Sequence, residues 1–388
     1  MQRTLALLIA CALMSACSNQ LGAAPPAGRA AMTRSVAHAA DSGTALPGDS
    51  GTALPGAQLA CVPNVATGSA SCSIAININI APIGSPTTPA SMIPGLHPAD
   101  LQNAYTLPGS DAGERVAVVD AYDDPAAESD LNVYRTAFGL PVCTTSNGCF
   151  SRVNESGATD AYPAPSASWS QEIALDLEMI SAMCPRCSIL LVEANSASLD
   201  DLGTAVDTAV AQGARVVSNS YYSAEWSGET AEDAHFAHAG VVMTASSGDQ
   251  DYPSYPAASP YVVSVGGTTL EDGSEQPWTF SGHGCSAYER AVRWQNGLTG
   301  CTTRSAVDVA AVADPQGGVA IFDSTAGGWL VAGGTSVGAP IVAAAYALAH
   351  NGAAAPFTYA HASSLHHIGG SAYGLYTGLG SPSGLNAF

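Results

Sequence analysis

The sequence predicts an α/β fold in which helices cover a mostly parallel central sheet, with a disordered linker ahead of it. From about residue 115 onward, short apolar runs rich in β-branched residues alternate with helical patterns, which is typical of parallel strands joined by helices. The stretch before residue 93 is rich in Ala, Gly, Pro, Ser and Thr, a composition that cannot build a core. The 388 residues, 47% of them hydrophobic, suffice for one large domain.

The first 17 residues have the pattern of an export signal. A short charged start precedes an apolar run from Leu5 to Met14, which is too short for a lasting membrane span. The run ends in Met14-Ser15-Ala16-Cys17, which resembles the lipobox of bacterial lipoproteins. Lipid anchoring at Cys17 and ordinary cleavage near Ala16 are both left open. Either one predicts an exported protein, extracellular or anchored at the cell surface.

Residues 18–92 are expected to be a low-complexity linker or a short prosegment. The octapeptide Asp-Ser-Gly-Thr-Ala-Leu-Pro-Gly occurs at 41–48 and again at 49–56, as in a flexible tether. The domain itself is expected to span residues 93–388.

The charge balance excludes one class of partner. With 11 basic and 32 acidic residues the net charge is −21, so the chain repels nucleic acid and anionic membrane surfaces. We therefore expect no nucleic-acid partner, and we expect a monomer.

Eight cysteines remain beyond Cys11 and Cys17, and in an oxidising compartment an even set predicts disulfides. The simplest pairing joins near neighbours: Cys61 with Cys72, Cys143 with Cys149, Cys184 with Cys187, and Cys285 with Cys301. Other connectivities stay open. A redox or zinc role for the Cys-Pro-Arg-Cys stretch at 184–187 is the alternative, but no second such pair accompanies it.

The secondary structure follows from the alternation along the chain. Strands are predicted at 115–120, 189–192, 216–218, 241–244 and 262–265, with helices around 171–183, 199–212, 229–239 and 334–349. In a parallel sheet of this kind the ligand crevice lies at the carboxyl ends of the strands.

The sharpest chemical signal is Gly333-Gly-Thr-Ser336-Val-Gly-Ala-Pro340, which opens an alanine-rich helix. A serine at a helix N-terminus lies beside free backbone N–H groups, which stabilise developing negative charge. A simple helix cap is the structural alternative. The octapeptide, however, resembles the nucleophile motif shared by subtilisins and sedolisins, which makes Ser336 the candidate nucleophile.

A serine nucleophile needs a base, and none of the nine histidines lies in a suitable motif; His235 and His238 fall in an ordinary amphipathic helix. Glu172 and Asp176 stand four residues apart, which places both carboxylates on one helix face. Such a pair shares protons and raises one pKa, giving a base that works in acid. A solvated acidic face is the alternative. Glu178 falls on another face and is expected to be exposed.

Asp249 ends the turn Ala245-Ser-Ser-Gly-Asp249, directly after the strand at 241–244. A turn aspartate is ordinarily a cap, but this one lies at the carboxyl end of the sheet.

These blocks together make the chain from about residue 93 to 388 resemble the sedolisin family of serine-carboxyl peptidases. Further stretches match in order: 101–105, 118–123, 217–220, 280–286 and 308–315. The resemblance implies a subtilisin-like three-layer sandwich and an acid-active peptidase acting on proteins or peptides through an acyl-enzyme. It also implies the roles of four residues: Ser336 as nucleophile, Glu172 as base, Asp176 as its supporter and Asp249 in the oxyanion hole. Asp120 and Asp123 are assigned structural roles.

The chain departs from the family pattern in two places. Sedolisins usually carry a longer folded prosegment, so inhibition by a prodomain is in doubt. The family's calcium site is expected to be lost, leaving no cofactor or metal, because His367 and Leu375 stand where carboxylates are expected. No carboxylate follows Pro315 except Asp323, and packing of Ile368, Tyr373 and Leu375 is expected to hold that loop instead.

Two other functions are weighed. A catalytically silent surface lipoprotein that keeps the scaffold for binding predicts broken catalytic positions, yet all four are present. An esterase using Ser336 is the second of these. Gly334-Thr-Ser336-Val-Gly338 fits the Gly-x-Ser-x-Gly pattern of an esterase elbow, but a serine at the start of a helix fits an amidase of the subtilisin type better.

Overall fold

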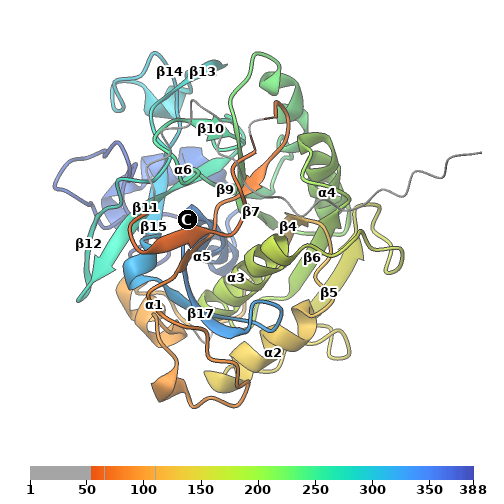
Figure 1. Cartoon of the computed structure of the whole chain (residues 1–388). Helices are drawn as coiled ribbons and strands as arrows, with labels where there is room; N and C mark the ends of the chain where they lie inside the picture. The colour runs from red at the N-terminus through yellow and green to blue at the C-terminus, as the bar shows by residue number, and fades with distance from the viewer. Residues whose placement is uncertain (1–53, 65, 110) are drawn as a thin grey trace, which may run out of the picture. The chain divides into compact units, whose positions relative to one another are not determined.

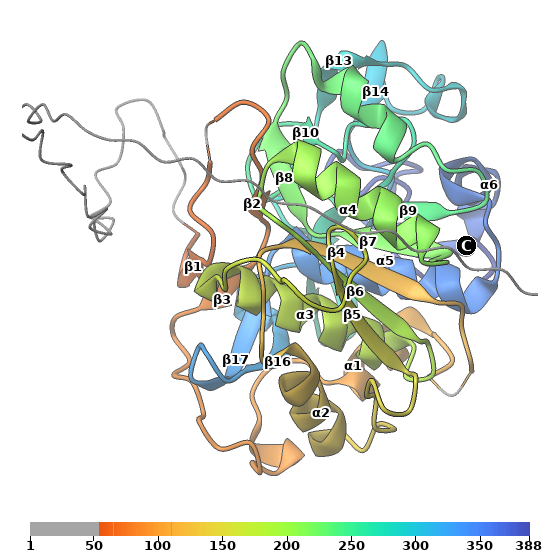
Figure 2. The same ribbon diagram turned by 90° about the vertical axis from the view of Figure 1, so that its right-hand side faces the viewer.

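The computed structural model describes residues 54–388, except residues 65 and 110. The export signal with Cys17 and the octapeptide repeat up to residue 53 lie outside the described residues. The described part forms one compact unit of three layers, with a central sheet between two layers of helices (Figures 1 and 2). The predicted α/β class and its largely parallel sheet are confirmed.

The central sheet has eight strands in the order β12-β11-β9-β7-β4-β6-β5, with β15 also paired to β11. Apart from the antiparallel β12, neighbouring strands run parallel. The strands are β4 (Val116–Ala121), β5 (Phe150–Asn154), β6 (Ile189–Ala194), β7 (Val216–Asn219), β9 (Val242–Ser246), β11 (Val263–Glu271), β12 (Ser274–Pro277) and β15 (Val309–Val312). The central strands are buried along their whole length, because helices cover both faces of a parallel sheet.

Helices α3 (Ala167–Met183) and α5 (Thr335–Ala349) pack against each other and on one face of the sheet, whereas α4 (Leu199–Ala211) covers the other face (Figure 2). Helices α1 (Pro98–Tyr105) and α2 (Ala127–Ala137) pack outside α3, and α6 (Ala354–Ala360) follows α5. The stretch predicted as a helix at 229–239 is instead a 3₁₀ helix, η2 (Glu229–His235).

Three small sheets complete the unit. The first contains, in order, β1 (Ala57–Leu59), β3 (Ala75–Asn77), β17 (Gly328–Gly333) and β16 (Val319–Asp323). The second contains β10 (Ser254–Tyr255), β8 (Tyr221–Ala224) and β2 (Ser71–Cys72). The third pairs β13 (Cys285–Arg290) with β14 (Thr303–Ser305).

The folded unit begins well before Ile93, where the sequence analysis placed its start. Strands β1, β2 and β3 all precede that residue. Strand β2 pairs with β8 and β3 pairs with β17, while β1 pairs with β3. The side chain of Ile74 is completely buried in the core. The correction has a simple cause: these strands are two or three residues long and their partners are distant in sequence, so local composition gives no sign of them.

Helix α3 is buried on all sides from Glu172 to Met183, which overturns the prediction that Glu178 is exposed. Its carboxylate accepts a hydrogen bond from the backbone N–H of Phe322 at 2.9 Å. Helix α2 and β16 cover the face that carries it. Burial raises the pKa of Glu178 well above its usual range.

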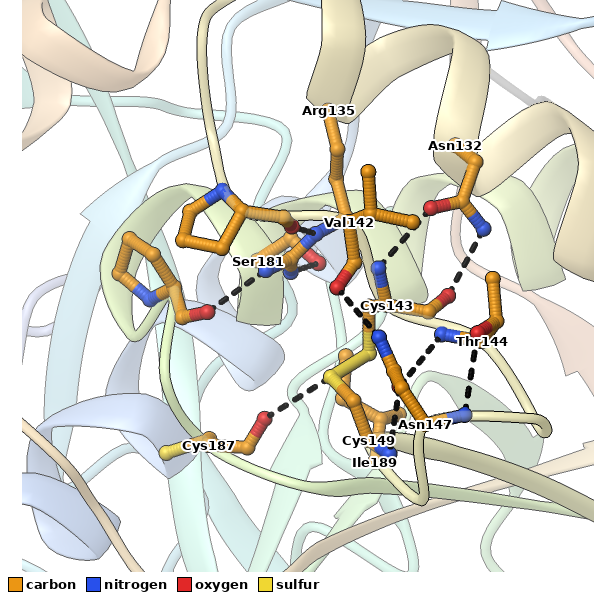
Figure 3. The surroundings of a disulfide bond; sticks show 12 residues. Asn132, Arg135, Val142, Cys143, Thr144, Asn147, Cys149, Ser181, Cys187 and Ile189 are labelled. Atoms are coloured by element: carbon orange, nitrogen blue, oxygen red, sulfur yellow. Dashed lines mark hydrogen bonds between the residues drawn. A yellow bond between two sulfur atoms is a disulfide. The ribbon is translucent and has the colours of Figure 1, made fainter.

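The four disulfides are those of the simplest pairing: Cys61–Cys72, Cys143–Cys149, Cys184–Cys187 and Cys285–Cys301. Figure 3 shows how the second is held. The side chain of Asn132 on α2 donates to the carbonyl of Cys143 at 2.7 Å and accepts from its N–H at 2.9 Å. Buried Arg135 ties α2 to α3 by donating to the Ser181 hydroxyl at 2.7 Å. Among the described residues these bridges close short local loops around the sheet.

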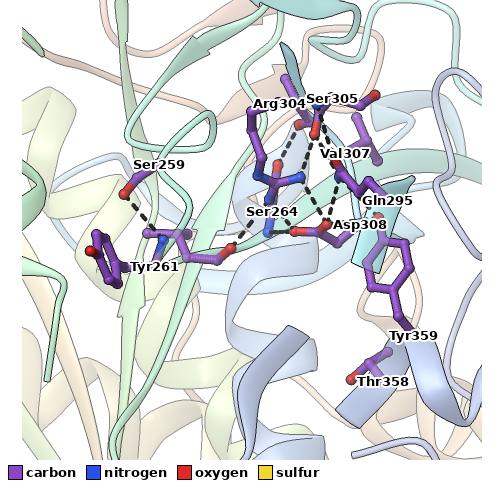
Figure 4. Close-up of polar contacts among 12 residues, drawn as sticks. Ser259, Tyr261, Ser264, Gln295, Arg304, Ser305, Val307, Asp308, Thr358 and Tyr359 are labelled. Atoms are coloured by element: carbon purple, nitrogen blue, oxygen red, sulfur yellow. Dashed lines mark hydrogen bonds and ion pairs between the residues drawn. The ribbon is translucent and has the colours of Figure 1, made fainter. Parts of the chain in front are cut away.

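Arg304 and Asp308 form a fully buried ion pair at 2.5 Å beside β15 (Figure 4). The Asp308 carboxylate also accepts from the Ser264 N–H at 2.9 Å and from the Tyr359 hydroxyl at 2.9 Å. Every oxygen of this carboxylate therefore has donors, as a buried charge requires. The cluster joins β11, β14, β15 and α6.

Candidate active site

Ser336 is the second residue of α5, and this helix begins directly after strand β17 and Gly334. Gly334 makes the sharp turn between them with a φ of 92°, a conformation that favours glycine. The Ser336 hydroxyl donates a hydrogen bond to the carbonyl of Ser220 at 3.3 Å. The predicted serine thus lies at a helix N-terminus, beside the carboxyl end of β7.

Helix α3 brings Glu172 and Asp176 to the same place, and both side chains are completely buried. The pKa of Glu172 is raised well above its usual range, first by burial and then by the nearby charges of Asp176 and Asp120. Interaction with the Ser336 hydroxyl opposes that rise, although neither carboxyl oxygen has a partner at normal hydrogen-bond geometry among the described residues. The serine and the carboxyl are therefore neighbours without a hydrogen bond of normal geometry between them.

Asp176 is held by Ser220, whose hydroxyl donates to its Oδ1 at 2.7 Å. Burial raises the pKa of Asp176, and this hydrogen bond lowers it in part. One serine therefore contacts both ends of the candidate catalytic group, with its side chain on Asp176 and its carbonyl on Ser336.

A third buried carboxyl belongs to this group. Asp120, on β4, has both oxygens buried without hydrogen-bond partners among the described residues. Burial, followed by the charge of Asp176, raises its pKa. The sequence analysis gave Asp120 a structural role. A buried carboxyl on the strand beneath α3 instead contributes to the electrostatics of the Glu172–Asp176 pair, and its place at the end of a buried strand run was the available signal.

Asp249 follows β9 and faces the start of α5. Its Oδ1 accepts from the N–H of Thr335 at 2.8 Å and from the hydroxyl of Thr335 at 2.9 Å. Its Oδ2 is buried and has no hydrogen-bond partner among the described residues. A Cβ atom added to Gly334 would lie 2.5 Å from this oxygen, so Oδ2 lies close to the turn before α5. Burial raises the pKa of Asp249 to about 7, against the lowering effect of Thr335. When this carboxyl group is protonated, its O–H can donate a hydrogen bond to an acceptor near the turn.

No histidine among residues 54–388 belongs to this group. His235 and His238 both bond to Asp207, and His283 bonds to the carbonyl of Ser281. The others contact backbone carbonyls or Glu275: His97, His350, His361, His366 and His367. Among the described residues, the ionisable side chains buried beside Ser336 are therefore carboxyls.

The sequence analysis missed Ser73, whose backbone contacts the backbone of the candidate nucleophile Ser336. Its carbonyl accepts a hydrogen bond from the Ser336 N–H at 3.1 Å, and its own N–H donates to the carbonyl of Ser220 at 3.3 Å. Its side chain is completely buried. The only local signal was Cys72 beside it, since the surrounding composition is typical of a linker.

The C-terminal loop is held differently from the expectation. Ile368 is buried, but Leu375 is 50% exposed and fills no gap in the core. Tyr373 instead donates its hydroxyl to the carbonyl of Val307 at 2.7 Å. A carboxylate does reach this loop from β12, because Glu275 bonds to Ser381 and to His366. The loop itself has no carboxylate, and the one that reaches it comes from a strand about 100 residues earlier in the chain. Among the described residues no cluster of three or more His, Cys, Asp or Glu side chains is arranged to hold a metal ion.

The arrangement combines a hydroxyl at a helix N-terminus, a buried carboxyl pair beside it and the buried Asp249 carboxyl at the start of the same helix. This set can take a proton from an attacking hydroxyl and stabilise the oxyanion that forms on a carbonyl.

Known peptidases resemble this chain in sequence and in fold. The model of the subtilase family (Peptidase_S8) matches residues 157–366. Xanthomonalisin from Xanthomonas sp. (strain T-22), a sedolisin, is 32% identical over an alignment of 118 residues, and the match covers 24% of this chain and 14% of that protein. The matched part thus spans a small fraction of the curated relative.

Solved structures share the fold. Pseudomonas sedolisin, complexed with pseudo-iodotyrostatin, is 23% identical with a TM-score of 0.64, covering 75% of this chain and 96% of that one. A lanthipeptide protease is 14% identical with a TM-score of 0.53, covering 75% and 92%. The subtilisin-like fold and the likeness to sedolisins expected from the sequence are confirmed. Because the family model covers more than half of its residues, the chain belongs to the subtilase family.

Proposed function

We propose that this protein is an acid-active serine peptidase in which Ser336 is the nucleophile and Glu172 the general base. Asp176 supports Glu172, and Asp249 forms the oxyanion hole together with the Ser336 N–H. The observation that carries the proposal is the burial of Glu172 and Asp176 beside Ser336, with every described histidine engaged elsewhere.

The chemistry follows from these positions. Glu172 takes the proton of the Ser336 hydroxyl as its oxygen attacks the scissile carbonyl, and then passes the proton to the leaving amine. Asp249 must be protonated to donate to the oxyanion. Its pKa of about 7 keeps the proton in place below neutral pH, so the same residue ties activity to acid.

The substrates are proteins or peptides, and the chain is exported, in keeping with its four disulfides and its predicted signal. Lipid anchoring at Cys17 and ordinary cleavage near Ala16 both agree with export, and a monomeric state is part of the proposal. None of the helices within residues 54–388 is long and apolar enough to cross a membrane.

Casein cleavage from about pH 3 to 8, measured for wild type and for Ser336→Ala, tests the function. We expect acid-dependent cleavage that is abolished in the variant. Hydrolysis of a small ester without any protein cleavage would favour the esterase, and inactivity toward both would favour the silent scaffold.

A further inference from the structure

The glycine turn, formed by Gly333 and Gly334, sets where α5 begins and therefore where Ser336 lies. Ser336 follows Gly334 by only two residues, and the helix starts between them at Thr335. One contact of this turn belongs to the candidate active site, because Asp249 Oδ2 lies close to Gly334. The turn is also in contact with a stretch of chain outside that site.

Residues 313–315, which follow the end of β15, make this second set of contacts. The Gly334 N–H donates to the carbonyl of Ala313 at 2.6 Å. A Cβ atom added to Gly333 would lie 2.4 Å from the Pro315 nitrogen and 2.5 Å from the Ala313 oxygen, so the two backbones touch and only glycine fits there. Because a close-packed interior transmits displacements, a shift of residues 313–315 would move the start of α5.

The side chain of Asp314 holds this stretch in place. Its Oδ1 accepts from the Gln316 N–H at 2.9 Å and so caps the 3₁₀ helix η4 (Pro315–Gly317). Its Oδ2 accepts from the hydroxyl of Thr269 on β11 at 2.8 Å. Both carboxylate oxygens are therefore used to hold residues 313–315 against the central sheet. Within the described part of the chain, neither hydrogen bond reaches the four residues of the proposed catalytic group.

We propose that Asp314 is a positioning residue for the nucleophile: it fixes residues 313–315, these fix the glycine turn, and the turn sets the place of Ser336. The inference rests on the proposed function. A displacement of about 1 Å at a reacting group can lower a rate about 10²-fold, even when the altered residue lies away from the chemistry. Asp314 therefore influences kcat without touching the substrate and without exchanging a proton.

The test compares Asp314→Ala with Ser198→Ala in the full-length chain, by single-turnover cleavage of one peptide and by steady-state kcat and KM at about pH 4. Ser198 caps α4, on the other face of the sheet, by accepting from the Asp201 N–H at 3.1 Å. Both variants thus lose a helix cap, and both should lower the melting temperature. Only Asp314→Ala should lower kcat, by roughly tenfold to a hundredfold, with KM within about twofold of wild type.

Two further variants separate positioning from a loss of folding. Asp314→Asn keeps an acceptor for the Gln316 N–H and places an amide group beside the Thr269 hydroxyl, so it should restore most of kcat. Thr269→Val removes the partner of Oδ2 but keeps a β-branched side chain on its strand, so it should lower kcat by a smaller factor than Asp314→Ala. The pH profile of kcat/KM should keep its wild-type limbs in all of these variants, because the proton transfers involve other residues.

The outcomes separate this inference from the proposed function. Wild-type kcat in Asp314→Ala, or in Thr269→Val where Asp314→Ala does not fold, overturns the positioning role and leaves the peptidase assignment standing. An equal loss of kcat in Ser198→Ala would show that stability alone sets the rate, and a shifted pH limb would show that Asp314 exchanges a proton; either result overturns the inference. A wild-type chain that cleaves no casein at any pH contradicts the proposed function and the inference together.

Discussion

The Ser220 hydroxyl donates to Asp176 at 2.7 Å, while the carbonyl of the same residue accepts the hydroxyl of Ser336 at 3.3 Å. One residue on the loop after β7 thus sets the positions of both the nucleophile and the carboxyl pair. Since the hydrogen bond to Asp176 lowers a pKa that burial raises, Ser220 also adjusts the protonation of the pair.

Replacing Ser220 with alanine should therefore move the acidic limb of the kcat/KM profile to higher pH, because Asp176 holds its proton more tightly without the bond. The matched control is Ser223→Ala on β8, whose hydroxyl donates a hydrogen bond to the neighbouring carbonyl of Ala224 and to no other group in the described part of the chain. Both profiles are to be measured on the same peptide substrate. A Ser220→Ala profile that superimposes on wild type would show that the serine has only a structural role.

The carboxyl pair and the serine should act as a unit. Ser336→Ala, Glu172→Ala and Asp176→Ala are each expected to lower kcat by several powers of ten, roughly 10⁴-fold or more for the nucleophile and the base. The losses should not add in the double variants, because the groups work on one proton. Single-turnover assays on one peptide measure them, and near-wild-type turnover in Glu172→Ala would remove this residue from the mechanism.

Activity should fall as pH rises through about 7, since Asp249 loses the proton that it must donate and its pKa is raised to about 7. Asp249→Ala should cost about 10²–10³ in kcat, as removal of one oxyanion donor does. Asp249→Asn keeps an N–H donor at all pH values and should soften the loss above neutrality. Equal pH profiles for wild type and Asp249→Asn would contradict the assigned proton.

The fold itself should be most stable in acid. The pKa values of Glu172, Asp176, Glu178 and Asp249 are all raised in the folded state, mainly by burial. The unfolded chain releases these protons from about pH 4 upward, whereas the folded chain retains them, so stability falls as pH rises through the folded pKa values. The melting temperature should decline between about pH 4 and 8.

Glu178 allows this stability effect to be tested away from the catalytic group. Glu178→Gln keeps an acceptor for the Phe322 N–H and removes the buried ionisable group, so it should raise the melting temperature at neutral pH and have little effect in acid. Glu271→Gln, at the exposed end of β11, is the control. The series should be run in the Ser336→Ala background, so that self-cleavage cannot alter the chain during heating.

Calcium should not stabilise the chain. Hydrogen bonds of Ser381 to Glu275 and of the Tyr373 hydroxyl to Val307 hold the loop near residues 365–382. Calcium requires six to eight oxygen ligands, and the loop itself has no carboxylate to supply. Melting temperatures with excess calcium and with a chelator are expected to agree within error. A drop of many degrees with the chelator, or one bound calcium per chain by elemental analysis, would contradict the proposed loss of the site.

Features that depend on neighbouring residues could be predicted from the sequence alone. The spacing of four between Glu172 and Asp176 defines a shared helix face because a helix repeats every 3.6 residues. The glycines before Ser336 and the alanines after it mark a turn and a helix start. The cysteine pairs close short loops, and the apolar runs of the central strands define a buried parallel sheet.

Tertiary structure alone decided what surrounds these groups. Whether Glu178 meets water depends on α2 and β16, and whether Asp120 influences Asp176 depends on how β4 lies beneath α3. The place of Ser73 depends on strands from opposite ends of the chain, since β3 pairs with β17 through backbone hydrogen bonds that leave no trace in composition. Burial and strand pairing are properties of distant residues brought together, and these decide the protonation of the site and the segment that covers it.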